Sequence, residues 1–356
     1  MKLLVFGGAG FVGSSVVRLF KRHDGNAVIT VFDNLHRRGS EINLPVFKHL
    51  GVRFIHGDVR SPSDLEEISG EFDLCIEASA EPSVHAGVAG SGAPDYVLQT
   101  NLVGAANCLN YIRRRVGKLV FLSTSRVYSI EPLRNVAIEE TATRMDLAAE
   151  QQRPGVSREG FSEDFTTAAP RSLYGTTKLC AELLVQEFAD LYGLNAVIYR
   201  CGVIAGPGQF GKTDQGVFTF WVASHYFGRP LQYTGFGGQG KQVRDLLHPE
   251  DLFDLIRRHM DRIDASARTY NVGGGRQGAV SLMELTELCR QVTGRKVPMS
   301  SLPETSRVDI PIYISDCRKI REELGWSPQR GVETIVRGID EWIRGNEAAL
   351  APIFGL

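Results

Sequence analysis

The chain has 356 residues, of which 43% are hydrophobic and 23% are charged, and its formal net charge is −1. This composition indicates a globular protein with one large or two medium domains and a substantial core. The near-zero charge favours neither a nucleic-acid partner nor an anionic membrane surface, and no stretch is apolar enough to span a membrane. The six cysteines are scattered without a Cys-x-x-Cys pair, which favours reduced thiols over disulfides or a metal site. The N-terminal apolar run is too short for a signal peptide, so we expect a cytoplasmic enzyme-sized protein.

The first element is a strand followed by a glycine-rich turn and a helix. Residues 3–6 are a short apolar run, typical of a strand buried on both faces, and residues 11–22 show an amphipathic helical pattern. Gly7 allows a tight turn, Gly10 lets the backbone approach a pyrophosphate, and Gly13 lets the helix pack closely on the strand. The helix N-terminus attracts the anion, so we include Phe11 and Val12 in the cofactor site. The alternative is a tight turn without a ligand.

The second strand, residues 28–32, ends at an acidic residue, Asp33. In a dinucleotide-binding fold this carboxylate accepts hydrogen bonds from the adenosine ribose and repels a 2′-phosphate, which favours NAD over NADP. Arg37 and Arg38 follow closely and could instead bind a phosphate. We give Asp33 more weight because the strand end fixes its position, and we include Asn34 and Arg37 in the cofactor site.

Four further apolar runs alternate with helical patterns, at residues 52–56, 74–78, 118–122 and 196–200, with long helices at 96–115 and 174–192. This alternation predicts an α/β fold with a Rossmann-type, doubly wound parallel sheet, whose ligands lie at the carboxyl ends of the strands. The cofactor residues that we expect there are Asp58, Val59, Ala78, Ser79, Ala80, Asn101, Ser123, Cys201 and Val203. Asp58 suits the adenine amino group, and it equally suits a helix N-cap.

The regular alternation is interrupted between residues 130 and 169, where the sequence is polar and lacks periodicity. Such an insertion is typical of a lid or substrate loop, and it equally fits a surface decoration. Shorter elements follow residue 203, with helices expected near 217–227, 249–260, 282–293 and 332–344. We therefore expect an NAD-binding domain of residues 1–203 and about 243–272, and a smaller C-terminal substrate-binding domain of residues 204–242 and 273–356. The glycine clusters at 237–238 and 273–275 are interpreted as turns.

Tyr174 and Lys178 lie four residues apart on one predicted helix and so share a face. The ordinary pKa of tyrosine, near 10, is too high for a base at neutral pH, but an adjacent ammonium lowers it. Such a tyrosine can take a proton from a sugar hydroxyl while NAD⁺ takes the hydride from the same carbon. Thr124, at the end of the fifth strand, could hydrogen-bond the developing carbonyl oxygen. The alternative is an exposed aromatic residue beside a solvated lysine.

These motifs together resemble the extended short-chain dehydrogenase/reductases, which include nucleotide-sugar epimerases and dehydratases. The resemblance is carried by the three glycines, Asp33, the Ser-Thr-Ser strand end at 123–125, and Tyr174-x-x-x-Lys178, and it runs over nearly the whole chain. It implies an enzyme with NAD as cofactor, a nucleotide-sugar substrate, and a homodimer or dimer-based oligomer built through the helices at 96–115 and 174–192. Those helix faces could instead be core.

Finer likeness points to the CDP-paratose 2-epimerase (CDP-tyvelose epimerase) branch, through residues 33–39, 81–84, 208–210, 214–216 and 240–245. In that branch the Asp33, Arg37 and Arg38 pattern accompanies NAD. The resemblance implies a set of substrate-binding residues: Pro82, Ser83, Thr124, Ser125, Gln209, Phe210, Gln215, Gly216, Gln242, Arg244 and Arg307. Arg244 and Arg307 are candidates for holding the diphosphate, and the alternative for each is a surface ion pair.

Two features depart from the family pattern. The 130–169 insertion is longer than expected, and Ser125-Arg126 stands where a dehydratase would have an Asp-Glu pair, which argues against 4,6-dehydration. The resemblance therefore implies an epimerase that transiently oxidises the sugar to a ketone and returns hydride to the opposite face, converting CDP-paratose to CDP-tyvelose at C2. The alternatives are another nucleotide-sugar epimerase, reductase or decarboxylase acting on a UDP- or dTDP-hexose, and a non-catalytic NAD-binding sensor.

Overall fold

The computed structural model describes residues 1–88, 94–211 and 215–354, so Asp214 of the 214–216 motif lies outside the described residues. Contacts within the chain define two compact units. Unit 1 comprises Met1–Val127, Ser172–Arg200 and Leu252–Tyr270, and unit 2 comprises Tyr128–Arg171, Cys201–Asp251 and Asn271–Leu356. Both units are therefore assembled from segments that are distant in the sequence.

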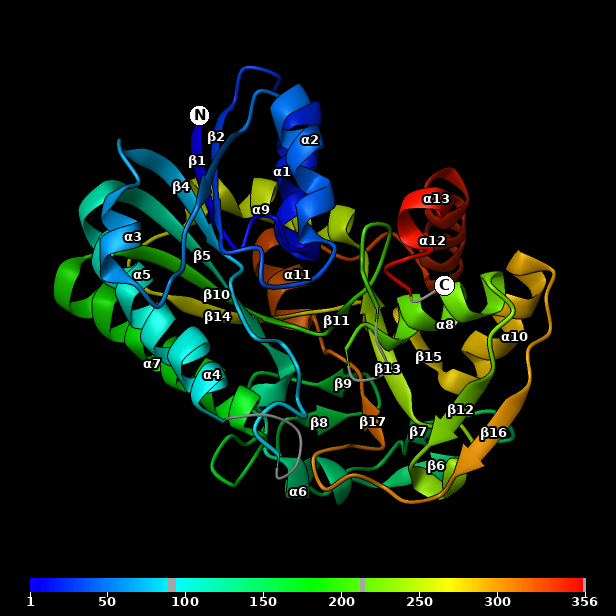
Figure 1. The fold of residues 1–356 in the computed structure, drawn as a ribbon. Helices are drawn as coiled ribbons and strands as arrows, with labels where there is room; N and C mark the ends of the chain where they lie inside the picture. The colour runs from blue at the N-terminus through cyan, green and yellow to red at the C-terminus, as the bar shows by residue number, and fades with distance from the viewer. Residues whose placement is uncertain (89–93, 212–214, 355–356) are drawn as a thin grey trace. The chain divides into compact units, whose positions relative to one another are not determined.

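A seven-stranded sheet forms the centre of unit 1, in the order β14-β10-β5-β4-β1-β2-β3 (Figure 1). Its strands are β1 Lys2–Phe6, β2 Val28–Asp33, β3 Arg53–His56, β4 Phe72–Glu77, β5 Val116–Thr124, β10 Asn195–Cys201 and β14 Arg268–Val272. The registers for β1 with β2 and β4, for β2 with β3, and for β4 with β5 are all parallel. The predicted doubly wound parallel sheet is confirmed, and β14 is the strand supplied by the segment expected to return.

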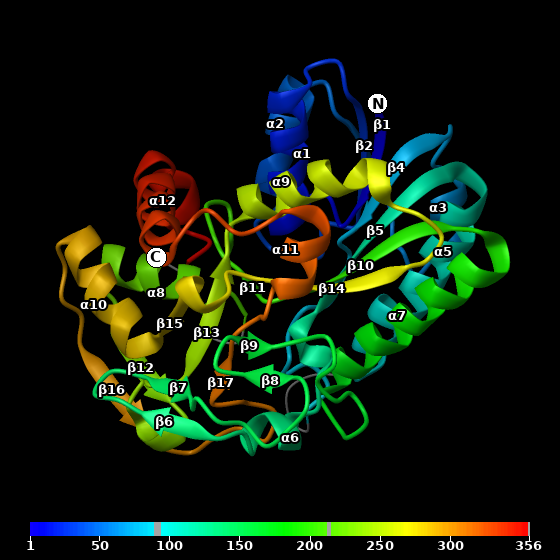
Figure 2. The ribbon, with the colours of Figure 1, turned by 180° about the vertical axis from the view of Figure 1, so that it is seen from behind.

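Helices cover both faces of this sheet (Figures 1 and 2). On one face lie α1 Phe11–His23, α2 Asn43–His49 and α9 Pro249–His259, and Phe20 of α1 meets Phe253 of α9 edge to face at 4.9 Å. On the other face lie α3 Pro62–Glu66, α5 Gly104–Arg115 and α7 Leu173–Tyr192. The predicted helix at 96–115 forms as α4 Pro94–Leu98, a π-helical turn η2 Gln99–Val103, and α5. Short 3₁₀ turns are η1 Ser40–Ile42, η3 Ser125–Val127 and η5 Met260–Arg262.

Unit 2 contains a small mixed sheet and several helices, three of which pack together. The sheet runs β11-β13-β15, with β17 paired to β13, and a separate parallel pair joins β12 to β16. Its strands are β11 Val203–Ile204, β12 Leu231–Thr234, β13 Val243–Leu247, β15 Ala279–Ser281, β16 Met299–Leu302 and β17 Ile312–Tyr313. The helices are α8 Val217–Tyr226, α10 Leu282–Thr293, α11 Arg318–Leu324, α12 Val332–Gly345 and α13 Glu347–Leu350, and α8, α10 and α12 contact one another. Of two 3₁₀ turns, η4 Phe236–Gly238 contains the glycine cluster at 237–238, and η6 Arg276–Gly278 directly follows the cluster at 273–275.

The segment expected to be irregular, residues 130–169, is only partly so. It forms α6 Ile130–Arg134 and two antiparallel hairpins, β6 Ile138–Glu140 with β7 Met145–Leu147, and β8 Val156–Ser157 with β9 Gly160–Phe161. Phe161 is fully buried, stacks on Tyr313 at 5.3 Å and meets Phe165 edge to face at 4.9 Å. These aromatic side chains make the segment part of the core of unit 2.

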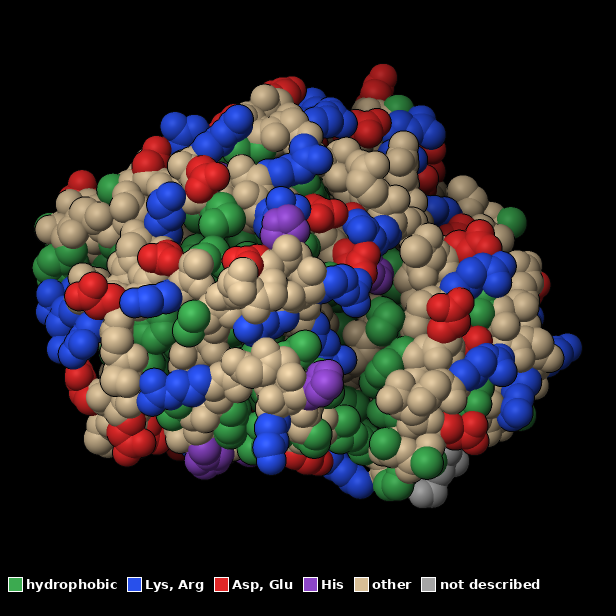
Figure 3. Space-filling model, turned by 90° about the horizontal axis from the view of Figure 1, so that it is seen from above, with side chains coloured by type: hydrophobic (Ala, Val, Ile, Leu, Met, Phe, Trp, Pro, Cys, Tyr) green, Lys and Arg blue, Asp and Glu red, His purple; other side chains and the backbone are tan. Residues whose placement is uncertain are grey.

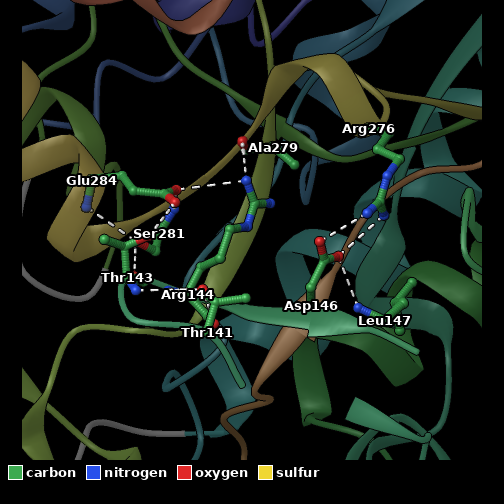
Figure 4. Close-up of polar contacts among 9 residues, drawn as sticks. All are labelled: Thr141, Thr143, Arg144, Asp146, Leu147, Arg276, Ala279, Ser281 and Glu284. Carbon is green, nitrogen blue, oxygen red and sulfur yellow. Dashed lines mark hydrogen bonds and ion pairs between the residues drawn. The ribbon is translucent and has the colours of Figure 1, made fainter. Parts of the chain in front are cut away.

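Polar contacts connect the β6–β7 hairpin to β15, α10 and the turn η6 (Figure 4). Arg144 donates to the carbonyl oxygen of Ala279 and lies 3.6 Å from Glu284, while Arg276 donates to both carboxylate oxygens of Asp146 at 3.1 and 2.8 Å. The expected domain boundaries placed residues 130–169 and 243–251 with the NAD-binding domain, whereas the contacts group them with unit 2. The physical reason is this set of hairpin contacts, together with the pairing of β13 with β15 and β17.

The surface carries both kinds of charge. On the face drawn in Figure 3, Lys and Arg side chains are interspersed with Asp and Glu over most of the visible area, in line with the net charge of −1. Among the residues that the structure describes, no helix has both the length and the apolar character needed to cross a membrane.

The close packing of α1 on the turn after β1 can be tested at Gly13. A Cβ atom there would lie 2.6 Å from Cα of Gly8 and closer still to the carbonyl oxygen of Gly7, both backbone atoms. We expect Gly13→Ala to lower the free energy of unfolding by about 1–3 kcal/mol, measured by urea denaturation. The control is Gly25→Ala, where no atom of the described residues lies within 4 Å of the added Cβ and the change should stay within about 0.5 kcal/mol. Equal stability of the two variants would contradict this packing.

Candidate active site

The turn after β1 has the geometry of an anion-binding loop. Gly7 has φ of 67°, in the left-handed region, and a Cβ there would lie 2.7 Å from backbone atoms of Ala78 and Ser79. Gly10 is the N-cap of α1 and provides no side chain to cap its free N–H groups, and the first turn of the helix has no acidic residue. These N–H groups at a helix N-terminus suit a phosphate, so the residues fit the pyrophosphate of a dinucleotide.

Asp33 is the last residue of β2 and lies beside this turn. Its carboxylate accepts hydrogen bonds from the backbone N–H of Ala9 at 3.0 Å and of Leu35 at 2.8 Å. Burial raises the pKa of Asp33, while these backbone donors oppose the increase. The two bonds orient the carboxylate at the carboxyl end of the sheet, as expected for a residue that contacts the ribose.

The carboxylate of Asp58 lies after β3 and is held by two side chains. Arg60 donates to both of its oxygens at 2.9 and 2.7 Å, and Asn34 donates to Oδ2 at 2.9 Å. The Arg60 guanidinium lowers the pKa of Asp58, so it is a carboxylate at neutral pH. The N-cap interpretation of Asp58 is wrong, because α3 is capped by Ser61, whose hydroxyl accepts from the N–H of Asp64. Asp58 and Asn34 are thus brought together, and the buried Val59 follows directly.

The segment after β4 carries Ala78, Ser79 and Ala80 and continues to Pro82 and the buried Ser83. Asn101, buried in the π-helical turn, fixes this segment. Its Oδ1 accepts from the N–H of Glu81 at 2.7 Å, and its Nδ2 donates to the carbonyl oxygen of Glu81 at 3.0 Å and to the Thr177 hydroxyl at 3.3 Å. Asn101 therefore holds the loop backbone and α7 together, which is a positioning role.

Helix α7 places Tyr174 and Lys178 at its N-terminal end. Ser172 caps the helix by accepting from the N–H of Gly175 at 3.1 Å, so Tyr174 lies in the first turn. Tyr174 is half-buried, whereas Lys178 is only 2% exposed. The Lys178 ammonium lies 3.8 Å from Oε2 of Glu77 and 4.1 Å from the ring centroid of Phe121. Lys178 is therefore a buried cation, and the solvated-lysine alternative is wrong.

The end of β5 lies beside the same helix, because α7 contacts the 3₁₀ turn η3 that contains Ser125. Thr124 is buried, and its hydroxyl accepts from the N–H of Arg126 at 3.2 Å. The Ser123 hydroxyl donates to Glu182 of α7, and Arg200 of β10 donates to Glu182 with Nη2 at 2.8 Å. Ser123, Thr124 and Ser125 are thus held against the helix that carries the Tyr-Lys pair.

Two residues of this network were missed from the sequence, Glu77 and Glu182. Glu77 is a buried carboxylate that follows the apolar residues 74–76 of β4, and Glu182 continues the four-residue spacing of Tyr174 and Lys178. An acidic residue inside a buried strand is a signal in itself, because it requires a partner. The partner of Glu77 could not be named before the fold was known.

The expected substrate residues of unit 2 differ in whether their side chains already have partners within the unit. Gln209 is buried, donates to the carbonyl oxygen of Ile204 at 3.1 Å and accepts from the Thr219 hydroxyl at 2.6 Å. Phe210 is also buried and meets Trp342 edge to face at 5.9 Å. These two side chains are engaged within the unit, whereas Oε1 of Gln215 has no hydrogen-bond partner among the described residues.

Gly216 is the N-cap of α8, with φ of 77°, and follows Gln215 directly. Arg244 of β13 donates to Asp309 at 3.0 Å and to the carbonyl oxygen of Ile310 at 2.7 Å, and Arg307 is exposed. Gln242, another expected substrate residue, donates to the carbonyl oxygen of Thr234 at 3.1 Å. Of the expected cofactor residues, Cys201 ends β10 and is buried, and Val203 begins β11 and is half-buried. Arg244 is thus bonded to the segment that carries Arg307, two residues before Asp309.

Comparison with known proteins gives one family model that matches most of the chain, and relatives that match nearly all of it. A family model described as "NAD dependent epimerase/dehydratase family" matches residues 3–273. The chain is 29% identical to CDP-paratose 2-epimerase of Salmonella typhi, with 96% of this chain and 99% of that protein covered. It is 28% identical to dTDP-glucose 4,6-dehydratase of Streptomyces niveus, with 99% and 96% covered. Among solved structures, the UDP-glucose 4-epimerase of Thermus thermophilus in complex with NAD is similar with a TM-score of 0.74 at 25% identity, over 97% and 99% of the chains.

The match of the family model agrees with the geometry of unit 1. The model begins in β1 and extends past β14, so it includes the glycine turn, Asp33, Thr124, and the Tyr174 and Lys178 pair. The resemblance to extended short-chain dehydrogenase/reductases is confirmed. The chain therefore belongs to the NAD dependent epimerase/dehydratase family, and its cofactor is NAD.

Proposed function

We propose that the chain epimerises a nucleotide sugar by transient oxidation of a ring carbon, and that the reaction converts CDP-paratose to CDP-tyvelose at C2. The observation that carries the proposal is the buried Lys178 ammonium one helical turn after Tyr174, at the carboxyl end of an NAD-type sheet. Bound NAD supplies a hydride acceptor that can return the hydride, so the reaction consumes no external reductant. The family match and the 29% identity to a CDP-paratose 2-epimerase support the choice of reaction and substrate.

The proposed catalytic residues handle the proton and the developing carbonyl group. The Tyr174 phenolate takes the proton from the sugar hydroxyl, and the Lys178 ammonium makes this possible by stabilising the phenolate. The Thr124 hydroxyl donates a hydrogen bond to the oxygen that becomes the ketone. Ser125 and Arg126 follow Thr124, so no carboxylate stands at the two positions where a dehydratase would hold its acid and base. This favours epimerisation over dehydration.

The proposed substrate residues of unit 2 provide groups that suit a nucleotide diphosphate. Arg244 and Arg307 would pair with phosphate oxygens, since guanidinium groups bind phosphate bidentately. Arg244 would exchange its bond to Asp309 for the phosphate. Oε1 of Gln215, which has no hydrogen-bond partner in the described part of the chain, would accept from the ligand beside Gly216. A UDP-hexose is the second candidate substrate, because the structurally similar protein of Thermus thermophilus is a UDP-glucose 4-epimerase.

The reaction can be tested by proton NMR of the purified protein with CDP-paratose in deuterated water, without added NAD. We expect a mixture of CDP-paratose and CDP-tyvelose with no deuterium at C2, because the hydrogen stays with the bound cofactor. Deuterium at C2 would mean proton abstraction from carbon and would contradict the mechanism. A lack of conversion, even with added NAD⁺, would overturn the CDP-paratose assignment, and UDP- and dTDP-hexoses would be tested next. A stoichiometric change in NADH absorbance would indicate a reductase or decarboxylase instead.

The role of the tyrosine can be tested with Tyr174→Phe, which removes only the phenolic oxygen. We expect kcat to fall by about 10²–10⁴-fold, the usual contribution of a general base, with unchanged circular dichroism. The matched control is Tyr192→Phe, at the other end of the same helix, where the side chain is 56% exposed. Equal activity of both variants would rule out Tyr174 as the base, and wild-type ligand binding without turnover of any substrate would favour an NAD-binding sensor.

We also propose a homodimer formed through α5 and α7. Helix α7 exposes three large side chains, Leu183, Leu191 and Tyr192, that a partner surface would cover. Sedimentation velocity should give twice the monomer mass, and Leu183→Arg should shift the protein toward monomer. Val28→Arg is the control, because Val28 is similarly exposed but belongs to β2. A monomeric wild type at micromolar concentration would contradict the proposal.

A further inference from the structure

Glu77 is a buried carboxylate whose two oxygens have different surroundings. It ends β4 at the centre of the sheet, in register with Phe6 of β1 and Phe121 of β5, and it is 2% exposed. Oε1 accepts from the N–H of Ser79 at 3.0 Å and from the Ser79 hydroxyl. Oε2 has no hydrogen-bond partner among the described residues, and it lies 3.8 Å from the Lys178 ammonium.

The other buried carboxylate of this region, Glu182, has a different environment. Both of its oxygens accept hydrogen bonds from Arg200, at distances from 2.8 to 3.2 Å, and Ser123 donates to it as well. Its charge is therefore compensated by a hydrogen-bonded guanidinium. Glu77 instead faces the lysine side chain that the proposed mechanism uses.

Glu77 and Lys178 are charged groups that face each other: burial raises the pKa of Glu77, while the Lys178 ammonium and the bonds from Ser79 oppose the increase. Lys178 of α7 is the cation facing Glu77, and Cys75 of β4 and Cys108 of α5 are the other titratable groups that interact with it. Burial raises the pKa of both thiols well above the ordinary value, so they are neutral. Phe121 presents its ring to Lys178 from β5 and carries no charge.

We propose that Glu77 is the counter-charge of Lys178, and that it thereby sets the pH range in which Tyr174 can act as a base. The inference rests on the proposed roles of Tyr174 and Lys178. A buried ammonium without a counter-charge loses its proton easily, and the nearby carboxylate prevents this. The same negative charge partly cancels the field of the ammonium at Tyr174. Glu77 is thus a positioning residue that keeps the lysine charged and limits how far it can acidify the phenol.

The charges determine whether Glu77→Gln raises or lowers the pH at which Tyr174 loses its proton. With Glu77 ionised, the Glu77 and Lys178 pair is neutral, and a phenolate at Tyr174 adds a net negative charge. In Glu77→Gln the phenolate becomes the counter-ion of the lysine, so the first proton leaves the Tyr174 and Lys178 pair at a lower pH. Tyr174 and Lys178 titrate as a coupled pair, so the lower pH applies to the loss of the first proton from the pair. An opposite charge within about 4–6 Å shifts a pKa by about 1–3 units, so a shift of at least about 1 pH unit is expected.

The test is a spectrophotometric titration of tyrosinate in the purified full-length protein, which needs no substrate. The difference between wild type and Tyr174→Phe isolates Tyr174 from the other tyrosines, and the difference between Glu77→Gln and Glu77→Gln/Tyr174→Phe does the same in the variant. The midpoint should be lower in Glu77→Gln by at least about 1 pH unit. Asp73→Asn, which removes an exposed carboxylate from the same strand, should leave the midpoint unchanged.

An unchanged or higher midpoint in Glu77→Gln would overturn the inference. Glu77→Asp keeps the charge but moves it away from Lys178, so it should lower the midpoint by a smaller amount. If Glu77→Gln does not fold, this variant tests the inference in its place. In the catalysed reaction, the acid limb of the kcat profile should shift to lower pH by the same amount. A shifted titration without turnover of any nucleotide sugar would sink the proposed function alone, whereas turnover with an unshifted profile would sink this inference alone.

Discussion

The chemistry of unit 1 depends on keeping an ammonium group charged inside the protein. Desolvation favours the neutral form of a buried lysine, so a site that uses Lys178 as a cation has to stabilise it. The structure supplies a carboxylate at 3.8 Å and an aromatic face at 4.1 Å, from two neighbouring strands. The ring quadrupole attracts the cation without adding a charge of its own. Both groups favour the charged form of the lysine.

One face of α7 organises the polar groups at this end of the sheet. Tyr174, Lys178 and Glu182 follow one another at intervals of four residues and therefore share a face. Lys178 meets Glu77 of β4, and Glu182 meets Ser123 of β5 and Arg200 of β10. The helix is thus joined to β4 and β10 by ion pairs and to β5 by a hydrogen bond from Ser123. Its N-cap at Ser172 fixes where the first turn begins, and so where Tyr174 lies.

The fold was largely predictable because strands buried on both faces leave continuous apolar runs in the sequence. The runs at residues 3–6 and 28–32 became β1 and β2, and Tyr174 and Lys178 could be paired by helical spacing alone. The segment at 130–169 was harder, because the partner that buries Phe161 is Tyr313, in a distant part of the chain. A periodic pattern of hydrophobic residues shows which face of one helix or strand is buried. The strands of these short hairpins have too few residues to show such a pattern. The pairing of Glu77 with Lys178 likewise depends on the strand order, which places β4 beside β5 and under α7.

The energetic cost of Glu77 is itself an argument about its role. A buried ion pair rarely stabilises a protein more than apolar residues of the same size, because each charge loses its hydration. Oε2 of Glu77 also has no hydrogen bond to any residue that the structure describes, which adds to that cost. An apolar residue would continue the run of Leu74, Cys75 and Ile76 and pack with their neighbours, but it would leave the Lys178 ammonium without a counter-charge. The carboxylate is therefore understood more readily from the charge state of Lys178 than from the stability of the sheet.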